Sequence, residues 1–350
     1  MYVNPYLQKI HRIKDHEDRT NFLRLDMNEN PKGLPEKFVQ EVLSTITAET
    51  IASYPRKDAL VELIAEREGV YPENITLTNG SDEGIKLLYE TFTHKGANVV
   101  MVTPTFEMYR IYAEMFGIEV KAIPYGKDFV ITAEQIIDTM DANTDMVVLL
   151  NPNSPVGGVY SDEEFCQIIE KAREYDAVVC IDEAYYPFGV DTKVALTKTY
   201  DNVLVLRTFS KLFAMAGVRV GYVIGNEEPI RYMDNAEGSY NVNTLGVLFA
   251  EAILKKPEII QQLIDSEKVG KTYLVEQLDK HSYEHYGQYG NYILIKTKKA
   301  PKDVAAELRA QNIVIKTYGN ALLQDWIRVT TADVDTMKVF WDAFAKVEEL

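Results

Sequence analysis

The sequence predicts an α/β protein in which a large, mostly parallel sheet precedes a smaller α+β unit. Seven short apolar runs lie in the first two thirds of the chain, and most of them alternate with helix-like stretches. Such alternation favours a parallel sheet covered by helices on both faces. After about Asn241 the pattern turns helical and then mixes strands with helices. A chain of 350 residues has room for two domains.

The first part of the chain begins with an arm, residues 1–30, which is polar and bracketed by Pro5 and Pro31. Helical patterns follow from Glu36 and at 59–65. The apolar runs predict strands at 75–78, 98–102, 118–123, 146–150, 177–181, 203–207 and 218–224, with helices at 81–92, 106–116, 133–140 and 161–175. We therefore expect a seven-stranded large domain over residues 31–240.

The remaining residues, 241–350, predict a small α+β domain. Helical patterns lie at 245–254, 257–280 and 304–309 and from Val334, and strand-like runs lie at 292–295, 313–315 and 326–330. Strands and helices in this mixed order form a unit separate from the first sheet.

Composition excludes several classes of partner. A net charge of −16 opposes binding to nucleic acid or to an anionic membrane surface. No run approaches the ~18 apolar residues of a membrane span, and the first fifteen residues show no apolar export signal. Cys166 and Cys180 are the only cysteines, and both are expected to be buried thiols. These features predict a soluble cytoplasmic protein.

The stretch around Lys211 is the strongest functional signal. Ser210 and Lys211 follow the apolar run 203–206, and we expect them where a strand ends and a helix begins. A lysine in a partly desolvated pocket has a lowered pKa, and as the free amine it can form a Schiff base with an aldehyde. Ser210 and Arg219 are suited to a phosphate group, and Gly221 permits close backbone approach.

Several ordered motifs carry a resemblance to a known family. The run from Ser210 through Arg219 to Tyr222 resembles the lysine signature of the fold-type I pyridoxal-phosphate enzymes, the aspartate aminotransferase superfamily. Residues 151–157 resemble that family's Asn-Pro-x-x-Pro-x-Gly turn, and residues 182–185 resemble its Asp-x-x-Tyr motif. The stretches 25–31, 54–55 and 78–83 look most like the histidinol-phosphate aminotransferase branch.

The resemblance implies pyridoxal 5'-phosphate as the cofactor, bound covalently by Lys211. Asp182 would pair with the pyridine nitrogen and keep the ring electron-withdrawing. Asn151 and Tyr185 would bind the phenolic oxygen, and Phe106 would stack on the ring.

The cofactor's phosphate is expected at the start of the helix that follows strand 75–78. There Gly80, Ser81 and Asp82 would offer backbone N–H groups and the positive end of the helix dipole. Ser210 and Arg219 would complete the phosphate site.

The resemblance also implies a homodimer with shared active sites, because Tyr54 would reach the phosphate of the neighbouring subunit's cofactor. Tyr6, Asn28 and Asn151 belong to the expected substrate site. Arg328 would grip a substrate carboxylate bidentately. Lys316 departs from the family, which usually carries a second arginine near that position for a substrate phosphate.

These features predict amino transfer between glutamate or 2-oxoglutarate and a small phosphorylated amino compound, with histidinol phosphate as the best single candidate. Two alternatives stay open: an aminotransferase for another amino acid, and a pyridoxal-phosphate decarboxylase of phosphoserine or phosphothreonine. Residues 281–285 also fit the H-x-x-E-H signature of zinc peptidases. No third ligand is evident there, and we expect no metal.

Overall fold

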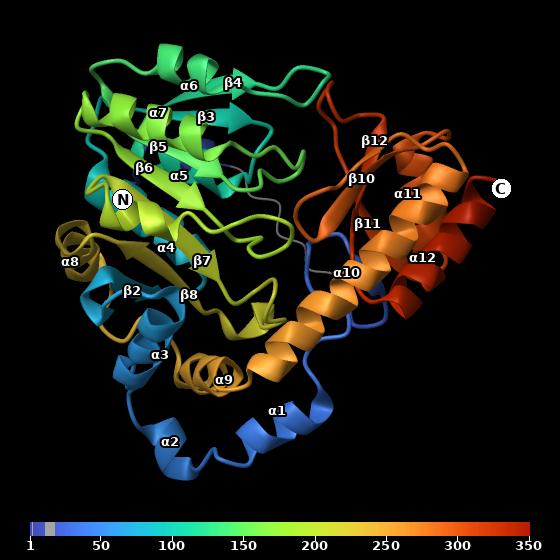
Figure 1. Cartoon of the computed structure of the whole chain (residues 1–350), viewed down its shortest axis with the longest axis horizontal. Helices are drawn as coiled ribbons and strands as arrows, with labels where there is room; N and C mark the ends of the chain where they lie inside the picture. The colour runs from blue at the N-terminus through green and yellow to red at the C-terminus, as the bar shows by residue number, and fades with distance from the viewer. Residues whose placement is uncertain (2, 11–17) are drawn as a thin grey trace.

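Two sheets organise the molecule. The computed structural model describes residues 1, 3–10 and 18–350, so residues 2 and 11–17 of the predicted arm lie outside the described residues. A seven-stranded sheet has the order β2-β8-β7-β6-β5-β3-β4, and a five-stranded sheet has the order β1-β11-β12-β10-β9. Figure 1 shows the larger sheet and its helices on one side and the smaller sheet, backed by α10, α11 and α12, on the other. The predicted mostly parallel, seven-stranded sheet is confirmed.

The large sheet contains β2 (Ile75–Thr78), β3 (Asn98–Thr103), β4 (Glu119–Pro124), β5 (Thr144–Leu150), β6 (Val178–Asp182), β7 (Val203–Thr208) and β8 (Gly221–Gly225). The helices in this part of the chain are α1 (Glu36–Leu43), α2 (Ala48–Ala52), α3 (Asp58–Glu68), α4 (Ser81–Phe92), α5 (Met108–Phe116), α6 (Ala133–Thr139), α7 (Asp162–Arg173), α8 (Glu227–Ala236) and α9 (Thr244–Leu254).

The small sheet contains β1 (Leu23–Leu25), β9 (His285–Tyr286), β10 (Tyr292–Lys296), β11 (Ile313–Thr317) and β12 (Trp326–Thr330). Its helices are α10 (Pro257–Lys280), α11 (Pro301–Arg309) and α12 (Val334–Val347).

Local sequence signals explain several element ends. At the start of α7, Ser161 Oγ accepts a hydrogen bond from the Glu164 N–H, and the Glu164 carboxylate accepts one from the Ser161 N–H. This reciprocal capping box satisfies two N–H groups that the first turn leaves unpaired. Helices α3 and α5 end at Gly69 and Gly117, whose φ angles of 66° and 72° lie in the left-handed region.

The large sheet has a hydrophobic core on each of its two faces, because successive side chains of its strands point to opposite faces. On β6, Val179 and Ile181 belong to the core that includes α3, α7 and α9, whereas Cys180 belongs to the core under α4 and α5. The apolar residues of β6 before Asp182 therefore pack on both faces of the sheet.

The small sheet faces the large domain with one side only. Ile327 and Val329 of β12 pack into the core formed with α10, α11 and α12, and Trp326 packs into the core of the large domain. Arg328 alternates with Ile327 and Val329, so it lies on the face of β12 that is turned toward the large domain.

The connection after β7 differs from the prediction. We expected a helix to begin at Lys211, but the chain makes turns and a short 3-10 helix, Ala216–Val218, before β8. Ala214 and Arg219 adopt left-handed φ angles of 54° and 55°, which an α-helix does not accommodate. β8 then pairs antiparallel with both β7 and β2 and begins at Gly221 rather than at residue 218.

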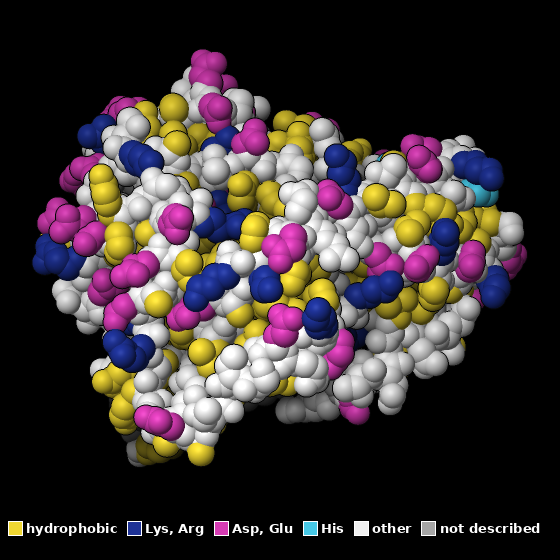
Figure 2. All heavy atoms as spheres, turned by 60° about the horizontal axis from the view of Figure 1, so that its bottom comes forward, with side chains coloured by type: hydrophobic (Ala, Val, Ile, Leu, Met, Phe, Trp, Pro, Cys, Tyr) yellow, Lys and Arg dark blue, Asp and Glu magenta, His cyan; other side chains and the backbone are white. Residues whose placement is uncertain are grey.

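Part of the predicted arm belongs to the small sheet, because β1 pairs parallel with β11. The domain bounds at residues 30 and 240 stay a prediction. Within the described residues, no helix is long and apolar enough to cross a membrane. Cys166 and Cys180 are free thiols, and Cys180 is buried. Figure 2 shows acidic and basic side chains interspersed with hydrophobic ones on one face.

Candidate active site

The site lies at the carboxyl ends of the large sheet's parallel strands, beside the small sheet. Ser210 and Lys211 follow β7, and Thr208 Oγ1 accepts a hydrogen bond of 3.1 Å from the Ser210 N–H. Lys211 Nζ donates to the Met27 carbonyl oxygen at 2.7 Å and lies 5.9 Å from the centre of the Tyr185 ring.

The Lys211 amine lies in a desolvating and partly cationic environment. Burial is the largest influence on its pKa and lowers it, and the charges of Arg328 and Arg219 act in the same direction, against Tyr185. A lysine with a lowered pKa supplies more of the neutral amine that acts as nucleophile or base.

Asp182, the last residue of β6, is buried and accepts hydrogen bonds at both oxygens. The Tyr109 hydroxyl donates to Oδ2 at 2.8 Å, and the Ala184 N–H donates to Oδ1 at 2.9 Å. Burial raises the pKa of this carboxyl to about 6, the neighbouring Glu183 also raises it, and the two donors oppose them. A nearby cationic ring would restore the charged form.

Asn151 and Tyr185 come from the turns that follow β5 and β6. The Asn151 N–H donates to the Asp182 carbonyl oxygen at 2.8 Å, which holds the two strand ends together. Tyr185 Oη accepts a hydrogen bond of 2.9 Å from Asn28 Nδ2. The Asn28 N–H in turn donates to Thr330 Oγ1 on β12, so the arm joins both sheets at this point.

The start of α4 provides a place for an anion. Gly80 is the N-cap residue and makes no side-chain cap, and Ser81 and Asp82 open the helix. A Cβ atom on Gly80 would lie 2.8 Å from Cζ of Arg219, and one on Gly221 would lie 2.5 Å from the Ser81 nitrogen. Only glycine therefore allows the guanidinium and β8 to come this close to the helix terminus.

Arg328 and Lys316 are direct partners on β12 and β11. Opposite residues of an antiparallel pair lie on the same face, so both cations are turned toward the large domain. The Arg328 Nη2 group donates to the Asp26 carbonyl oxygen at 2.6 Å and Nη1 donates to Ser154 Oγ at 3.3 Å. Its guanidinium lies 5.7 Å from the centre of the Tyr292 ring.

Three further predicted site residues, Tyr6, Tyr54 and Phe106, have exposed side chains. The Tyr6 ring covers Gly117 at the far end of α5, where a Cβ would lie 2.6 Å from Cε2 of the ring, and its role in the substrate site stays a prediction. Tyr54 is 74% exposed and stacks on Tyr240, with 4.2 Å between ring centres. Phe106 follows β3, and its side chain is 42% exposed.

Sequence reasoning missed a buried charge cluster around Glu183, the residue that follows Asp182. Arg207 Nε donates to the Glu183 carboxylate at 2.7 Å, Nη2 lies 3.5 Å from the Glu68 carboxylate, and the guanidinium lies 3.9 Å from the centre of the Tyr186 ring. Arg207 also donates to the Thr192 hydroxyl. The available signal was a single arginine ending the otherwise apolar run of β7.

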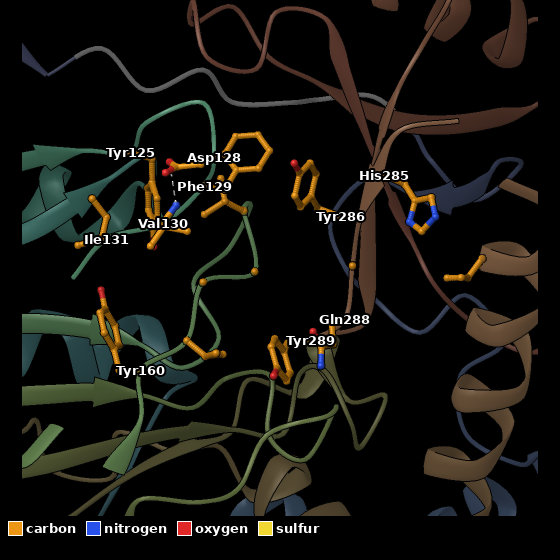
Figure 3. A pocket seen from close by; sticks show the side chains of 16 residues that line it. Tyr125, Asp128, Phe129, Val130, Ile131, Tyr160, His285, Tyr286, Gln288 and Tyr289 are labelled. Atoms are coloured by element: carbon orange, nitrogen blue, oxygen red, sulfur yellow. Dashed lines mark hydrogen bonds between the residues drawn. The ribbon is translucent and has the colours of Figure 1, made fainter. Parts of the chain in front are cut away.

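A cavity of about 590 Å³ lies in another part of the domain interface. It is lined by residues 125, 128–131 and 156–160 of the large domain and by Val275 and residues 285–289 of the small domain, without any residue of the predicted site. In Figure 3, Phe129 and Tyr286 lie side by side, and their ring centres are 4.7 Å apart.

The fold and these residues define a pyridoxal-phosphate enzyme, and comparison with known proteins supplies the family. Residues 20–342 match the family model of aminotransferase class I and II, and the chain belongs to this family. It is a pyridoxal-phosphate-dependent aminotransferase. A histidinol-phosphate aminotransferase of Caldanaerobacter subterraneus is 32% identical over 93% of this chain and 92% of its own length. One of Pyrococcus furiosus is 33% identical over 87% and 86%, respectively.

Solved structures agree in fold. The histidinol-phosphate aminotransferase of Clostridium acetobutylicum gives a TM-score of 0.85 at 26% identity, covering 93% of this chain and 99% of that one. The Sinorhizobium meliloti enzyme, solved in complex with pyridoxal 5'-phosphate, gives 0.88 at 19% identity and covers 99% and 97%. At 21% identity, the L-threonine-O-3-phosphate decarboxylase of Porphyromonas gingivalis gives 0.79, a likeness of fold alone.

Proposed function

We propose that the enzyme transfers the amino group between glutamate and histidinol phosphate. The observation that carries this proposal is the pair of cations on one face of the small sheet, Arg328 and Lys316, of which Arg328 is close enough to Lys211 to lower the pKa of its amine. Glutamate and a phosphorylated amine both bring an anionic group to this pocket. Histidinol-phosphate aminotransferases about 30% identical over most of the chain support the substrate.

The residues present fit the cofactor. Glycine at position 80 leaves room for Arg219 at the uncapped start of α4, and this is where the phosphate would bind, together with Ser81, Asp82 and Ser210. Asp182 would accept from the ring nitrogen. Asn151 and Tyr185 would hold the phenolic oxygen, and Phe106 would cover the ring.

When bound, pyridoxal phosphate supplies an aldehyde that binds amines covalently and a ring that withdraws electrons from the substrate's reacting carbon. Lys211 would provide the amine that anchors it and, once that amine is free again, would take the proton from that carbon and deliver it to the cofactor. Its desolvated surroundings favour the neutral form that both tasks require. Asp182 would stabilise the positive ring nitrogen, because its carboxylate is buried and its charge is only weakly screened by solvent.

Arg328 binds the glutamate carboxylate in one half-reaction and an anionic group of the second substrate in the other. Its present partners are the Asp26 carbonyl oxygen and the Ser154 hydroxyl, and a carboxylate is a stronger acceptor than either. Lys316 adds a second positive charge on the same face without the planar fork of an arginine.

We further propose a homodimer that acts in the cytoplasm. Tyr54 and Tyr240 form an exposed aromatic stack, which is a surface suited to contact a second copy. In such a dimer Tyr54 would reach the partner's cofactor phosphate. The free thiols agree with a reducing compartment.

Nitrogen transfer tests the reaction directly. Isotope-labelled glutamate, mixed with the holoenzyme and the keto counterpart of histidinol phosphate, should yield labelled histidinol phosphate. Parallel assays with O-phosphothreonine and O-phosphoserine should release no carbon dioxide. Carbon dioxide release without any transfer from glutamate would establish the decarboxylase alternative instead.

A further inference from the structure

A short chain of buried polar groups connects Asp182 through Tyr109 to Cys180. Cys180 and Asp182 are two residues apart on β6, so their side chains lie on the same face of the sheet, under α5. Tyr109 of α5 reaches both of them. Its hydroxyl lies 2.8 Å from Asp182 Oδ2 and 3.6 Å from Cys180 Sγ. Tyr109 and Cys180 are fully buried.

The direction of these hydrogen bonds follows from the protonation states. Burial raises the pKa of the Tyr109 phenol and of the Cys180 thiol, so both keep their hydrogens. A phenol has one hydrogen, and the charged carboxylate is its stronger acceptor. Tyr109 therefore donates to Asp182, and its own oxygen is left to accept from the Cys180 thiol.

Two donors then fix the plane of the Asp182 carboxyl group. Tyr109 donates to one oxygen, and the backbone N–H of Ala184 donates to the other. The Ala184 donor comes from the same turn as Asp182, whereas Tyr109 reaches across from α5, 73 positions away in the sequence. Tyr109 is thus the side-chain contact that sets how the carboxyl sits relative to the site.

We propose that Tyr109 is a positioning residue that keeps Asp182 ionised and aimed at the ring nitrogen of the cofactor. This inference rests on the role proposed above for Asp182. It assigns to α5 a part in the chemistry although Tyr109 itself touches neither the cofactor nor the substrate.

The electrostatics of Asp182 explain why such a donor is needed. Burial favours the neutral carboxyl, and Glu183 adds a like charge, while Tyr109, Ala184 and Lys211 favour the ionised form. Removing the hydroxyl would shift this balance toward the protonated carboxyl. A protonated Asp182 cannot pair with a positive ring nitrogen, so cofactor binding would weaken most where the variant is protonated and the wild type is not.

The chain offers a matched control. Tyr89 of α4 belongs to the same core, is equally buried, and carries a hydroxyl without a hydrogen-bond partner in the described part of the chain. Tyr109→Phe and Tyr89→Phe each remove one buried hydroxyl and keep the ring. If Tyr109 has only a structural role, the two variants should show the same cofactor binding and the same titration of Asp182.

The test measures pyridoxal phosphate binding to the apoenzyme by quenching of tryptophan fluorescence between about pH 6 and pH 9. Near pH 6, Tyr109→Phe should raise the dissociation constant roughly tenfold or more, the scale of one hydrogen bond to a charged group. The ratio to wild type should fall as the pH rises. Tyr89→Phe should follow the wild-type profile throughout, and circular dichroism should show all three proteins folded.

A second readout needs no cofactor. NMR of the Asp182 carboxyl carbon in the apoenzyme should show its titration moved upward by about one pH unit or more in Tyr109→Phe and unmoved in Tyr89→Phe. If the two variants share one binding profile and one carboxyl titration, the inference is wrong. Asp182→Ala separates the two proposals: if it too binds cofactor like the wild type, the proposed role of Asp182 has failed rather than that of Tyr109.

Discussion

Substituting Gly80 by alanine tests the phosphate end of the active site. Gly80 has a φ of +75°, and its Cβ would lie 2.8 Å from Cζ of Arg219. The methyl group must therefore displace the guanidinium or move the start of α4. Gly69 provides the control, because its φ is +66° and its Cβ position has no neighbour within 4 Å. Gly69→Ala therefore measures the free-energy cost of an alanine at positive φ without a steric clash of the new methyl group.

The loss of stability and the loss of cofactor affinity can be told apart by their sizes. In the left-handed helical conformation of Gly69 (φ +66°, ψ 38°) an alanine costs about 1–2 kcal/mol of unfolding free energy. Gly80 has φ +75° and ψ 161°, a conformation that is essentially restricted to glycine, so Gly80→Ala should lose at least that much. Displacing Arg219 from a phosphate additionally removes a charged hydrogen bond worth about 1.5–3 kcal/mol. Gly80→Ala should therefore weaken pyridoxal phosphate binding roughly 10- to 100-fold, while Gly69→Ala should leave it unchanged.

The assay pairs thermal unfolding of the apoenzymes with fluorescence titration by pyridoxal phosphate. If Gly80→Ala binds the cofactor like the wild type while losing at least as much stability as Gly69→Ala, the proposed contact between Arg219 and the phosphate is refuted.

Three further predictions follow from the site. Borohydride treatment of the holoenzyme should fix the cofactor on Lys211, as peptide mapping would show, and a label on another lysine would overturn that assignment. Mixed dimers of Tyr54→Ala and Lys211→Ala protomers should regain activity, because one of their two sites carries neither lesion; subunit exchange without recovery would mean that each site is built from one chain. Arg207→Met should cost about 3–5 kcal/mol of unfolding free energy, against less than about 1 kcal/mol for the exposed Arg110→Met. Burial raises the pKa of Glu183, so in Arg207→Met this carboxyl is more readily protonated at pH 5 than at pH 8. The loss of unfolding free energy should therefore be larger at pH 8, where an unpaired carboxylate is buried. An equal loss at the two pH values would contradict this prediction.

The sequence predicted elements well where the signal is local. The run 146–150 and the helix at 161–175 have a clear period and, for the helix, a capping box that begins at Ser161. The helix predicted after β7 was wrong because Ala214 and Arg219, in the connection from β7 to the antiparallel β8, adopt left-handed conformations. Such conformations in non-glycine residues leave no pattern in a single sequence.

The site residues likewise divide into those that the sequence motifs indicated and those that only tertiary packing brings together. Lys211, Asp182 and Asn151 were found because ordered motifs carried a resemblance to a family. Tyr109 was not found, since its partner lies 73 positions away and a tyrosine within an apolar helix face looks like an ordinary core residue. Only the packing of α5 on β6 brings the two together.

The main-chain contacts of residues 26–28 determine which sequence changes this part of the enzyme can tolerate. Three successive carbonyl oxygens, those of Asp26, Met27 and Asn28, accept hydrogen bonds from Arg328, Lys211 and Asn291, respectively. Main-chain atoms are the same for every residue type, so alanine scanning of Asp26 and Met27 would leave these acceptors in place. Inserting or deleting one residue would instead shift all three at once. Exchanging the side chains of Asp26 and Met27 therefore keeps these three acceptors, whereas the length of the stretch is constrained.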